Sequence, residues 1–473
     1  MSRSSLALPS RLRSPGLVVL TLLLASAGAC GSSGEETATD GETTAGTTTA
    51  GDDELTWWRD VEPIVRKKCM SCHYEGGIAP FSLESYESFA AFGSYLAPVV
   101  EAGVMPPWPA DNDCNDYLNN RALSDEQLET ILTFVAGDMP EGDPADAPED
   151  NEPPPRELVP DVVIDMPESY TSPSTVEDDY RCFLIPWPEE YTDPRFITGV
   201  EILPGEPRIV HHVIVYAVSE ADVPAYTALD DADPGAGYTC YGGPGPTNGT
   251  ARWVGGWVPG QVPVFMPEGV GTQIDPGTNL IMQVHYHPIG MELPDRSAIA
   301  LELAESVERR GEILPLADFK WLASDGSMLI PAGEPAATHQ VSITHDNPLL
   351  ANILINRLGL TVDTELEIIN AGLHMHTFGT HGRVELRDPA AQSSECVLDV
   401  PRWDFNWQMG FDLAEPARFS PGQELNVQCW WDNSAENQPI VDGVKQEPKD
   451  LDWGEGTSDE MCLGILYITN AEG

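Results

Sequence analysis

Seven of the ten histidines in this chain of 473 residues fall into three short clusters. In chain order the clusters are His211 with His212, His285 with His287, and His374 with His376 and His381. An H-x-H pair on a strand places both imidazoles on one face, close enough to share one metal ion. Imidazole binds zinc, copper, iron and nickel, and the methionines nearby favour copper that cycles through Cu(I). The clusters therefore predict metal sites, with core packing as the alternative for any cluster taken alone.

The adjacent pair His211 and His212 lies in the apolar run RIVHHVIVYAV, which is typical of a buried strand. Neighbouring side chains on a strand point to opposite faces. One histidine in the core and one at the surface is therefore the alternative interpretation of this pair. For both imidazoles to bind the same ion, the strand must twist or end at this point.

A second motif has the order C-x-x-C-H, with Cys69, Cys72 and His73 in KKCMSCHYEGG. This is the attachment pattern of covalently bound haem c, in which two thiols bond to the haem and the imidazole binds the iron. A chance redox or zinc-binding pair is the alternative. The opposite axial ligand is expected to be Met105 in EAGVMPPWPAD, although core packing is another role for Met105 and Met139 is a second candidate.

The first residues predict export. Arginines precede the apolar run GLVVLTLLLASAGA, as in a secretory signal peptide covering 1–29. Cleavage before Cys30 resembles the processing of bacterial lipoproteins, so Cys30 is expected to carry lipid and to anchor the chain at the periplasmic or outer face of a bacterial membrane. Residues 30–55 are rich in Gly, Thr, Ser and acid and predict a flexible linker. Outside the cytoplasm the cysteines can form disulfides.

Charge excludes one class of partner. Asp and Glu outnumber Lys and Arg by 76 to 24, which gives a formal net charge of −52. Such a chain repels nucleic acid and anionic lipid headgroups. Membrane contact is therefore expected only through the lipid anchor, and the expected partners are small molecules, cations and metals.

Residues 56–140 have a helical pattern, in which Ser124 begins a capping box. This pattern and the haem motif resemble a small, mainly α, cytochrome c-like domain. An acidic, proline-rich linker follows at 141–158. Short β-branched runs separated by Gly and Pro turns then predict two tandem all-β sandwiches of the jelly-roll-like kind, at 159–330 and 331–473.

The order of the motifs in the β region resembles the copper type II, ascorbate-dependent monooxygenases, the family of dopamine β-hydroxylase and peptidylglycine α-hydroxylating monooxygenase. His-His in a strand is followed by Q-V-H, then by L-H-x-H, and then by Met-Cys near the C-terminus. The stretches GWVPGQVPVFMPEGVG, GTNLIMQVHYHP, DFNWQ and DEMCLGILY also match the family. The match covers about residues 160–473.

The resemblance implies two copper ions with different ligands. They are His211, His212 and His285 for an electron-transferring copper, and His374, His376 and Met461 for an oxygen-activating copper. From the residues alone Met461 would be assigned to the core beside Leu463 and Ile465, and only the resemblance makes it a ligand. Gln283 also matches the family motif, but a structural role explains it equally well.

The resemblance also implies two disulfide bridges. They join Cys429 to Cys462, next to Met461, and Cys182 to Cys240. Cys114 and Cys396 have no implied role, and they either pair with each other or stay free.

The chain departs from the family at the substrate end. Gly372 stands where the peptidylglycine enzyme carries an arginine that holds the substrate carboxylate, and Leu463 and Ile465 replace Asn and Tyr anchors. A peptide with a free C-terminal glycine is therefore not expected as the substrate.

The implied protein is an exported copper-dependent monooxygenase. It would use dioxygen to hydroxylate a C–H bond of a small organic substrate, with electrons from an ascorbate-like reductant or a periplasmic donor. The haem at His73 is expected to reduce the copper held by the first histidines, with docking of the haem segment to another partner as the alternative. The rival function is that of a non-catalytic, lipid-anchored protein that binds copper and haem or transfers electrons.

Overall fold

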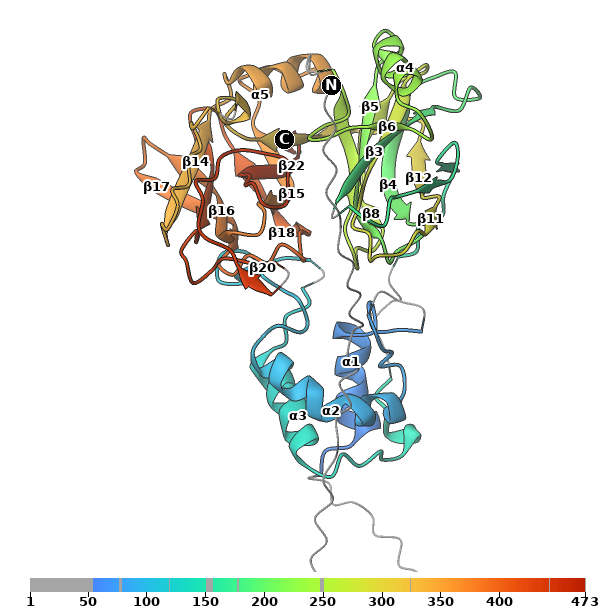
Figure 1. Ribbon diagram of the computed structural model, residues 1–473, viewed down its shortest axis with the longest axis vertical. Coiled ribbons are helices and arrows are strands. Elements are labelled where there is room, and N and C mark those ends of the chain that lie inside the picture. The colour runs from blue at the N-terminus through green and yellow to red at the C-terminus, as the bar shows by residue number, and fades with distance from the viewer. Residues whose placement is uncertain are drawn as a thin grey trace, which may run out of the picture. The chain divides into compact units, whose positions relative to one another are not determined.

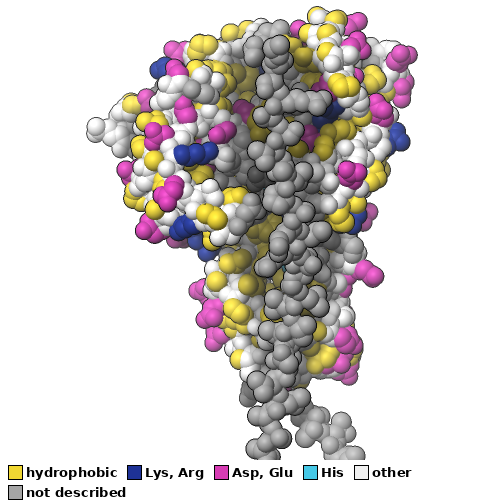
Figure 2. All heavy atoms as spheres, in the orientation of Figure 1, with side chains coloured by type: hydrophobic (Ala, Val, Ile, Leu, Met, Phe, Trp, Pro, Cys, Tyr) yellow, Lys and Arg dark blue, Asp and Glu magenta, His cyan; other side chains and the backbone are white. Residues whose placement is uncertain are grey.

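The computed structural model describes residues 54–75, 79–118, 120–149, 156–176, 178–246, 251–323, 325–441 and 443–472. The predicted signal peptide, the lipidation site Cys30 and nearly all of the linker 30–55 lie outside these residues. The described residues all belong to one compact unit, Asp53–Gly473. On the face drawn in Figure 2, acidic side chains far outnumber basic ones, as the net charge of −52 requires.

Among the described residues, three α-helices precede the strands (Figure 1). They are α1 (Glu62–Lys68), α2 (Tyr86–Glu101) and α3 (Asp125–Ala136), and the π-helical turn η1 (Trp57–Val61) leads into α1. The capping box at Ser124 is confirmed, because the side chains of Ser124 and Gln127 each accept a hydrogen bond from the other's backbone N–H. Trp57, Phe89 and Phe134 are buried where the helices meet.

The middle of the connection between α2 and α3, residues 106–118, is called the strap here, because its buried side chains pack outside the helical core. Trp108 is buried in the core of the C-terminal strands, with its ring 5.2 Å from that of Phe411. Cys114 in the strap forms a disulfide with Cys396. The strap is therefore part of the β structure, although it lies between two helices in the sequence.

The predicted fold class, a small mainly α domain followed by two tandem sandwiches, is wrong. Strands dominate the described residues, in which the five α-helices are short and the longest, α2, has 16 residues. The described residues contain no sizeable all-α, cytochrome c-like domain, because the strap leaves the helices and joins the β core. Its prolines suggested a loop of a helical domain, whereas its apolar side chains belong to the core of another part of the chain.

The main sheet has nine strands and runs through both halves of the β region. Its order is β1 (Val162–Asp165), β12 (Ala298–Ala304), β4 (Arg195–Leu203), β9 (Val270–Ile274), β13 (Arg309–Leu316), β22 (Leu463–Asn470), β15 (Leu366–His374) and β18 (Gly410–Phe419), with β8 (Val264–Phe265) paired to β4. The two expected sandwiches therefore share one sheet, which is the second respect in which the predicted fold class fails.

Each half of this sheet is covered by a smaller sheet. Over the N-terminal half, residues 162–304, lie β6 (Tyr238–Thr239), β3 (Asp179–Pro186), β10 (Asn279–Tyr286), β5 (Val210–Val218) and β7 (Arg252–Trp257). Over the C-terminal half, residues 309–470, lie β14 (Ala337–Ile343), β19 (Glu424–Trp431), β16 (Gly379–Asp388) and β17 (Ser393–Val400). The shorter elements are β2 (Tyr170–Thr171) with β11 (Pro294–Asp295), β20 (Ile440–Val441) with β21 (Val444–Lys445), α4 (Val223–Ala232), α5 (Pro348–Asn352), and the turns η2 (Pro144–Asp146), η3 (Trp321–Ala323) and η4 (Ile353–Leu358).

The two halves meet at the parallel pair β9 and β13, where Arg309 lies opposite Val270. Beside this seam Glu312 is buried, with its carboxylate in contact with the guanidinium of Arg252 and 3.7 Å from that of Arg357. A buried carboxylate between two guanidinium groups is a strongly directional contact. It fixes the seam although only a short stretch of backbone pairs there.

The described residues contain three disulfides, and these indicate an oxidising compartment. They join Cys114 to Cys396, Cys182 to Cys240, and Cys429 to Cys462. Both bridges implied by the resemblance are confirmed, and the open question about Cys114 is settled in favour of pairing. None of the helices in the described part of the chain is long and apolar enough to span a membrane.

Candidate metal clusters and the pocket between them

The paired histidines lie at an irregularity between β5 and β10. His285 on β10 is opposite His212, but the next residue, Tyr286, is opposite Val210, so His211 is left without a partner on β10. This is a β-bulge, in which one extra residue re-aims a side chain that regular pleating would send to the other face. The sequence argument required a distortion of the strand at this point, and the bulge supplies it.

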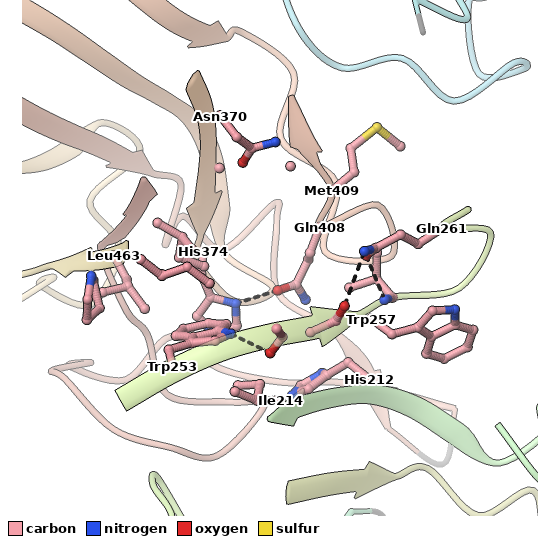
Figure 3. A pocket seen from close by; sticks show the side chains of 18 of the residues that line it. His212, Ile214, Trp253, Trp257, Gln261, Asn370, His374, Gln408, Met409 and Leu463 are labelled. Atoms are coloured by element: carbon pink, nitrogen blue, oxygen red, sulfur yellow. Dashed lines mark hydrogen bonds between the residues drawn. The ribbon is translucent and has the colours of Figure 1, made fainter. Parts of the chain in front are cut away.

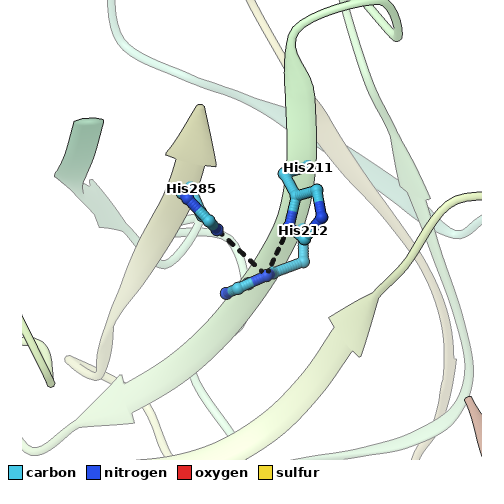
Figure 4. A group of neighbouring side chains, drawn as sticks. All are labelled: His211, His212 and His285. Carbon is cyan, nitrogen blue, oxygen red and sulfur yellow. Dashed lines mark hydrogen bonds between the residues drawn. The ribbon is translucent and has the colours of Figure 1, made fainter. Parts of the chain in front are cut away.

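Figure 4 shows His211, His212 and His285 turned toward one another from two adjacent strands. Nδ1 of His212 is 3.3 Å from Nδ1 of His211 and 3.3 Å from Nδ1 of His285. One ligand atom from each of the three residues lies within 4.8 Å of the others. This arrangement, hereafter the triad, brings together the three residues of the first predicted copper site.

The imidazoles of the triad are held neutral. Burial first, and then the neighbouring His285 and His287, lowers the pKa of His211 to about 4. Burial and the adjoining imidazoles also lower the pKa of His212, and burial lowers the pKa of His285. Neutral nitrogen lone pairs that converge on one point suit a cation that accepts imidazole, so the donor set fits a metal such as copper.

The second predicted site lies where β15 ends beside β22. His374 is the last residue of β15 and is opposite Leu463, the first residue of β22. His376 follows two residues later, with its ring centroid 5.1 Å from that of His374. Met461 is 7% exposed and precedes β22, next to Cys462 and its disulfide to Cys429. His374, His376 and Met461 line the same cavity, and they are called the Met cluster here.

A buried carboxylate that sequence reasoning missed organises the Met cluster. Glu460 is fully buried and accepts hydrogen bonds from the backbone N–H of His376 at 2.8 Å and from the indole N–H of Trp431 at 2.9 Å. Burial, only partly offset by these donors, raises the pKa of Glu460 to about 7. Glu460 therefore ties the turn that carries His376 to the segment that carries Met461.

The loop between β17 and β18 reaches from the Met cluster to the triad. Gln408 contacts Nδ1 of His374 through its side-chain oxygen, and the indole N–H of Trp403 donates to the carbonyl of His376 at 3.1 Å. The ring of Phe405 stacks on His211 with centroids 5.5 Å apart and lies 5.9 Å from the ring of His376. The DFNWQ stretch matched the family, but nothing in the sequence assigned Phe405 to both clusters.

A cavity of about 530 Å³ connects the two clusters (Figure 3). Its wall is mainly apolar and aromatic and includes Trp108 of the strap, Trp253, Trp257, Phe265 and Ile465. The histidines that line it are His212, His374 and His376. Arg121 is the one Lys or Arg among its lining residues, and it donates to the carbonyl of Gly260 at 3.1 Å.

The predicted haem-binding residues Cys69, Cys72 and His73 lie between α1 and α2. Cys69 and Cys72 are free, and Nδ1 of His73 is 3.1 Å from the carbonyl oxygen of Phe81. A donor at Nδ1 leaves Nε2 as the lone pair that binds a metal. Met105 is partly buried against the helical core, where Met139 also packs. Two unpaired thiols and an oriented imidazole fit the covalent attachment of haem c.

The other histidines of the clusters lie outside both groups of ligands. His287 is exposed, with Nδ1 3.3 Å from Asp178, and His381 stacks on Trp430 with centroids 4.1 Å apart while its Nε2 contacts Asp399 at 2.5 Å. Gln283 donates to the carbonyl of Cys240 at 2.9 Å, which is a structural role.

Comparison with known proteins adds no family. No family model matches the chain, and no curated protein matches it. Among solved structures, the major capsid protein P2 of bacteriophage PM2 overlaps 66% of this chain and 98% of its own, with 8% identity and a TM-score of 0.24. A structure of the infectious bursal disease virus Gx strain overlaps 63% and 58%, with 11% identity and a TM-score of 0.19. The VP2 subviral particle of that virus overlaps 67% and 74%, with 9% identity and a TM-score of 0.15.

Proposed function

We propose that this chain is an exported copper-dependent monooxygenase that hydroxylates a C–H bond of a small organic substrate. The observation that carries the proposal is a pair of unlike clusters joined by one cavity, which is lined by His374, His376 and Met461 and by one triad residue, His212. Simple storage of a metal gives no reason for two different ligand sets beside the same apolar space. An enzyme that uses two one-electron metal centres beside its substrate does require two such ligand sets.

The triad would hold one copper through His211, His212 and His285. The Met cluster would hold the other through His374, His376 and Met461, where a thioether favours Cu(I). Bound there, copper would supply one-electron redox chemistry at both clusters and the activation of dioxygen at the Met cluster.

The chain's own residues would bind and orient the substrate. Trp108, Trp253 and Ile465 give the cavity an apolar wall that excludes water and places a C–H bond toward the Met cluster. Gly372 also lines the cavity and offers no positive charge, and Arg121 already donates to a carbonyl. These features support a substrate without a carboxylate anchor, in agreement with the expectation drawn from Gly372.

Cys69, Cys72 and His73 would hold a haem c, with Met105 as the expected axial ligand, and its electrons would serve the triad. The support is local: Sγ of Cys72 lies against Gly260, which belongs to the wall of the cavity. Export, consistent with the three disulfides, and lipid attachment at Cys30 complete the proposal for where the protein works, with an ascorbate-like or periplasmic donor as the ultimate reductant.

The test is metal analysis and spectroscopy on protein matured in the periplasm. We expect two type 2 coppers and one haem per chain, the loss of one copper in His211→Ala and of the other in His374→Ala, and no loss in the matched control His339→Ala. Zinc in place of copper would overturn the proposal.

Oxygen uptake then separates the enzyme from its rival. The reduced, copper-loaded protein should consume dioxygen in step with hydroxylated product when it meets a suitable small apolar substrate. Two bound coppers with no uptake coupled to any substrate of a broad panel would favour the non-catalytic electron-transfer protein.

A further inference from the structure

Asp178 is a partly buried carboxylate that lies between the triad and the Met cluster. Its side chain is 11% exposed, and it immediately precedes β3. The next residue, Asp179, accepts hydrogen bonds from the hydroxyls of Tyr170 at 2.7 Å and Ser172 at 2.8 Å. These bonds anchor the backbone at the start of β3, so the position of Asp178 is well determined by its surroundings.

One oxygen of this carboxylate contacts His285 of the triad. Oδ1 of Asp178 lies 2.8 Å from Nε2 of His285. A carboxylate only accepts, so Nε2 of His285 carries the proton and Nδ1 presents its lone pair to His212.

The other oxygen serves the Met cluster. Oδ2 of Asp178 accepts a hydrogen bond from the hydroxyl of Thr457 at 2.6 Å. The carbonyl of Thr457 in turn accepts from the hydroxyl of Thr377, the neighbour of His376, at 3.2 Å. One carboxylate thus joins a triad imidazole in the N-terminal half to the turn of His376 in the C-terminal half.

We propose that Asp178 is a positioning residue for both clusters. It fixes His285 as an Nδ1 ligand, and through Thr457 it holds the triad and the Met cluster at one separation for electron transfer between them. This inference rests on the proposed function. Copper held by the triad would supply this electron on going from Cu(I) to Cu(II), and dioxygen at the Met cluster would be the group reduced by it.

Two substitutions in the full-length, copper-loaded protein separate the two roles. Asp178→Asn removes the charge that orients His285, so the affinity of the triad for Cu(II) should fall by about 10-fold to 100-fold, with a changed copper hyperfine pattern in the EPR spectrum. Thr457→Val breaks only the link to the Met cluster. Its Cu(II) affinity and EPR spectrum should match the wild type, while electron transfer from the triad slows by at least about threefold.

The matched control is Thr344→Val, because the hydroxyl of Thr344 also contacts a carboxylate, that of Asp346, away from the cavity. Electron transfer is followed by mixing reduced protein with dioxygen and substrate, freezing at set times, and measuring the Cu(II) signal of the triad. The control should match the wild type in affinity, spectrum and rate.

The inference is overturned if Asp178→Asn keeps the wild-type copper affinity and spectrum, or if Thr457→Val transfers electrons at the wild-type rate. Either result can occur in a protein that still binds two coppers and hydroxylates its substrate, so the proposed function would survive it. A wild-type protein that binds no copper would instead refute the proposed function.

Discussion

Replacing both Cys114 and Cys396 by serine tests whether the strap is an integral part of the β unit. The bridge closes a loop with a sequence separation of 282, for which the chain-entropy estimate is about 5 to 6 kcal/mol at 25 °C. The Cys182–Cys240 bridge lies inside that loop and shortens it, but the dependence is logarithmic and the change is only about 0.2 kcal/mol. Measured losses of native disulfides are commonly about 2 to 5 kcal/mol, so we adopt that range.

The size of the unit sets the thermal shift. For a unit of about 420 residues, the entropy of unfolding is near 0.9 kcal/mol per kelvin, and the loss corresponds to a fall in Tm of about 2 to 6 °C. Scanning calorimetry of the double variant against the wild type, with thiol labelling to verify the bridges, measures this. The Cys182→Ser/Cys240→Ser variant, which opens a shorter loop, gives a reference value for the fall in Tm on loss of a disulfide.

A fall in Tm of less than about 1 °C would refute the reasoning. It would mean that the strap detaches without affecting the rest of the unit, in spite of the backbone hydrogen bonds from Asp111 to Asp399 and from Leu118 to Asp412, both 2.8 Å.

Three further predictions concern single residues. Burial, the largest cause, raises the pKa of Glu455, which lines the cavity, from 4.5 to about 7, so the folded state binds this proton more tightly than the unfolded chain does. The free energy of unfolding of the metal-free protein should therefore fall as the pH rises from 4.5 to 7. Glu455→Gln should reduce this fall by up to about 3 kcal/mol in denaturant titrations. Met461→Leu keeps the apolar packing but removes the thioether, so Cu(I) affinity at the Met cluster should drop more than Cu(II) affinity in chelator competition, and equal losses would argue against Met461 as a ligand. Glu312→Gln removes the carboxylate charge from two partly buried guanidinium groups and should lower the free energy of unfolding by about 1 to 3 kcal/mol in urea titrations, while the exposed Glu395→Gln should be neutral.

Sequence patterns predicted which histidines would lie together, but not what holds them in place. The histidine clusters are recognisable because histidine is rare in the chain, and the H-x-H spacing predicts that both imidazoles lie on one face of a strand. The β-bulge that turns His211 toward His212 depends on register with β10, which no local pattern encodes. Asp178 is one acidic residue among 76 Asp and Glu, so its role becomes visible only once His285 and Thr457 are placed around it.

The fold class failed for a related reason. Helical periodicity correctly marked α2 and α3, but the core to which an apolar side chain belongs is a long-range property. Trp108 and Tyr117 looked like part of a helical domain because of their place in the chain, and they pack against Phe411 instead. The seam between β9 and β13 was hidden because so few residues pair there.

The position of β22 in the main sheet sets an order for folding. The last strand in the sequence lies between β13 and β15, at the centre of the C-terminal half and not at its edge. Until the C-terminus has arrived, β13 and β15 have no partner in common, and Met461 is absent from its cluster. Parallel or distant strand pairing of this kind is slow and leaves apolar edges exposed. Maturation of the C-terminal half must therefore wait until β22 has been synthesised, and removal of this one strand would split the main sheet in two.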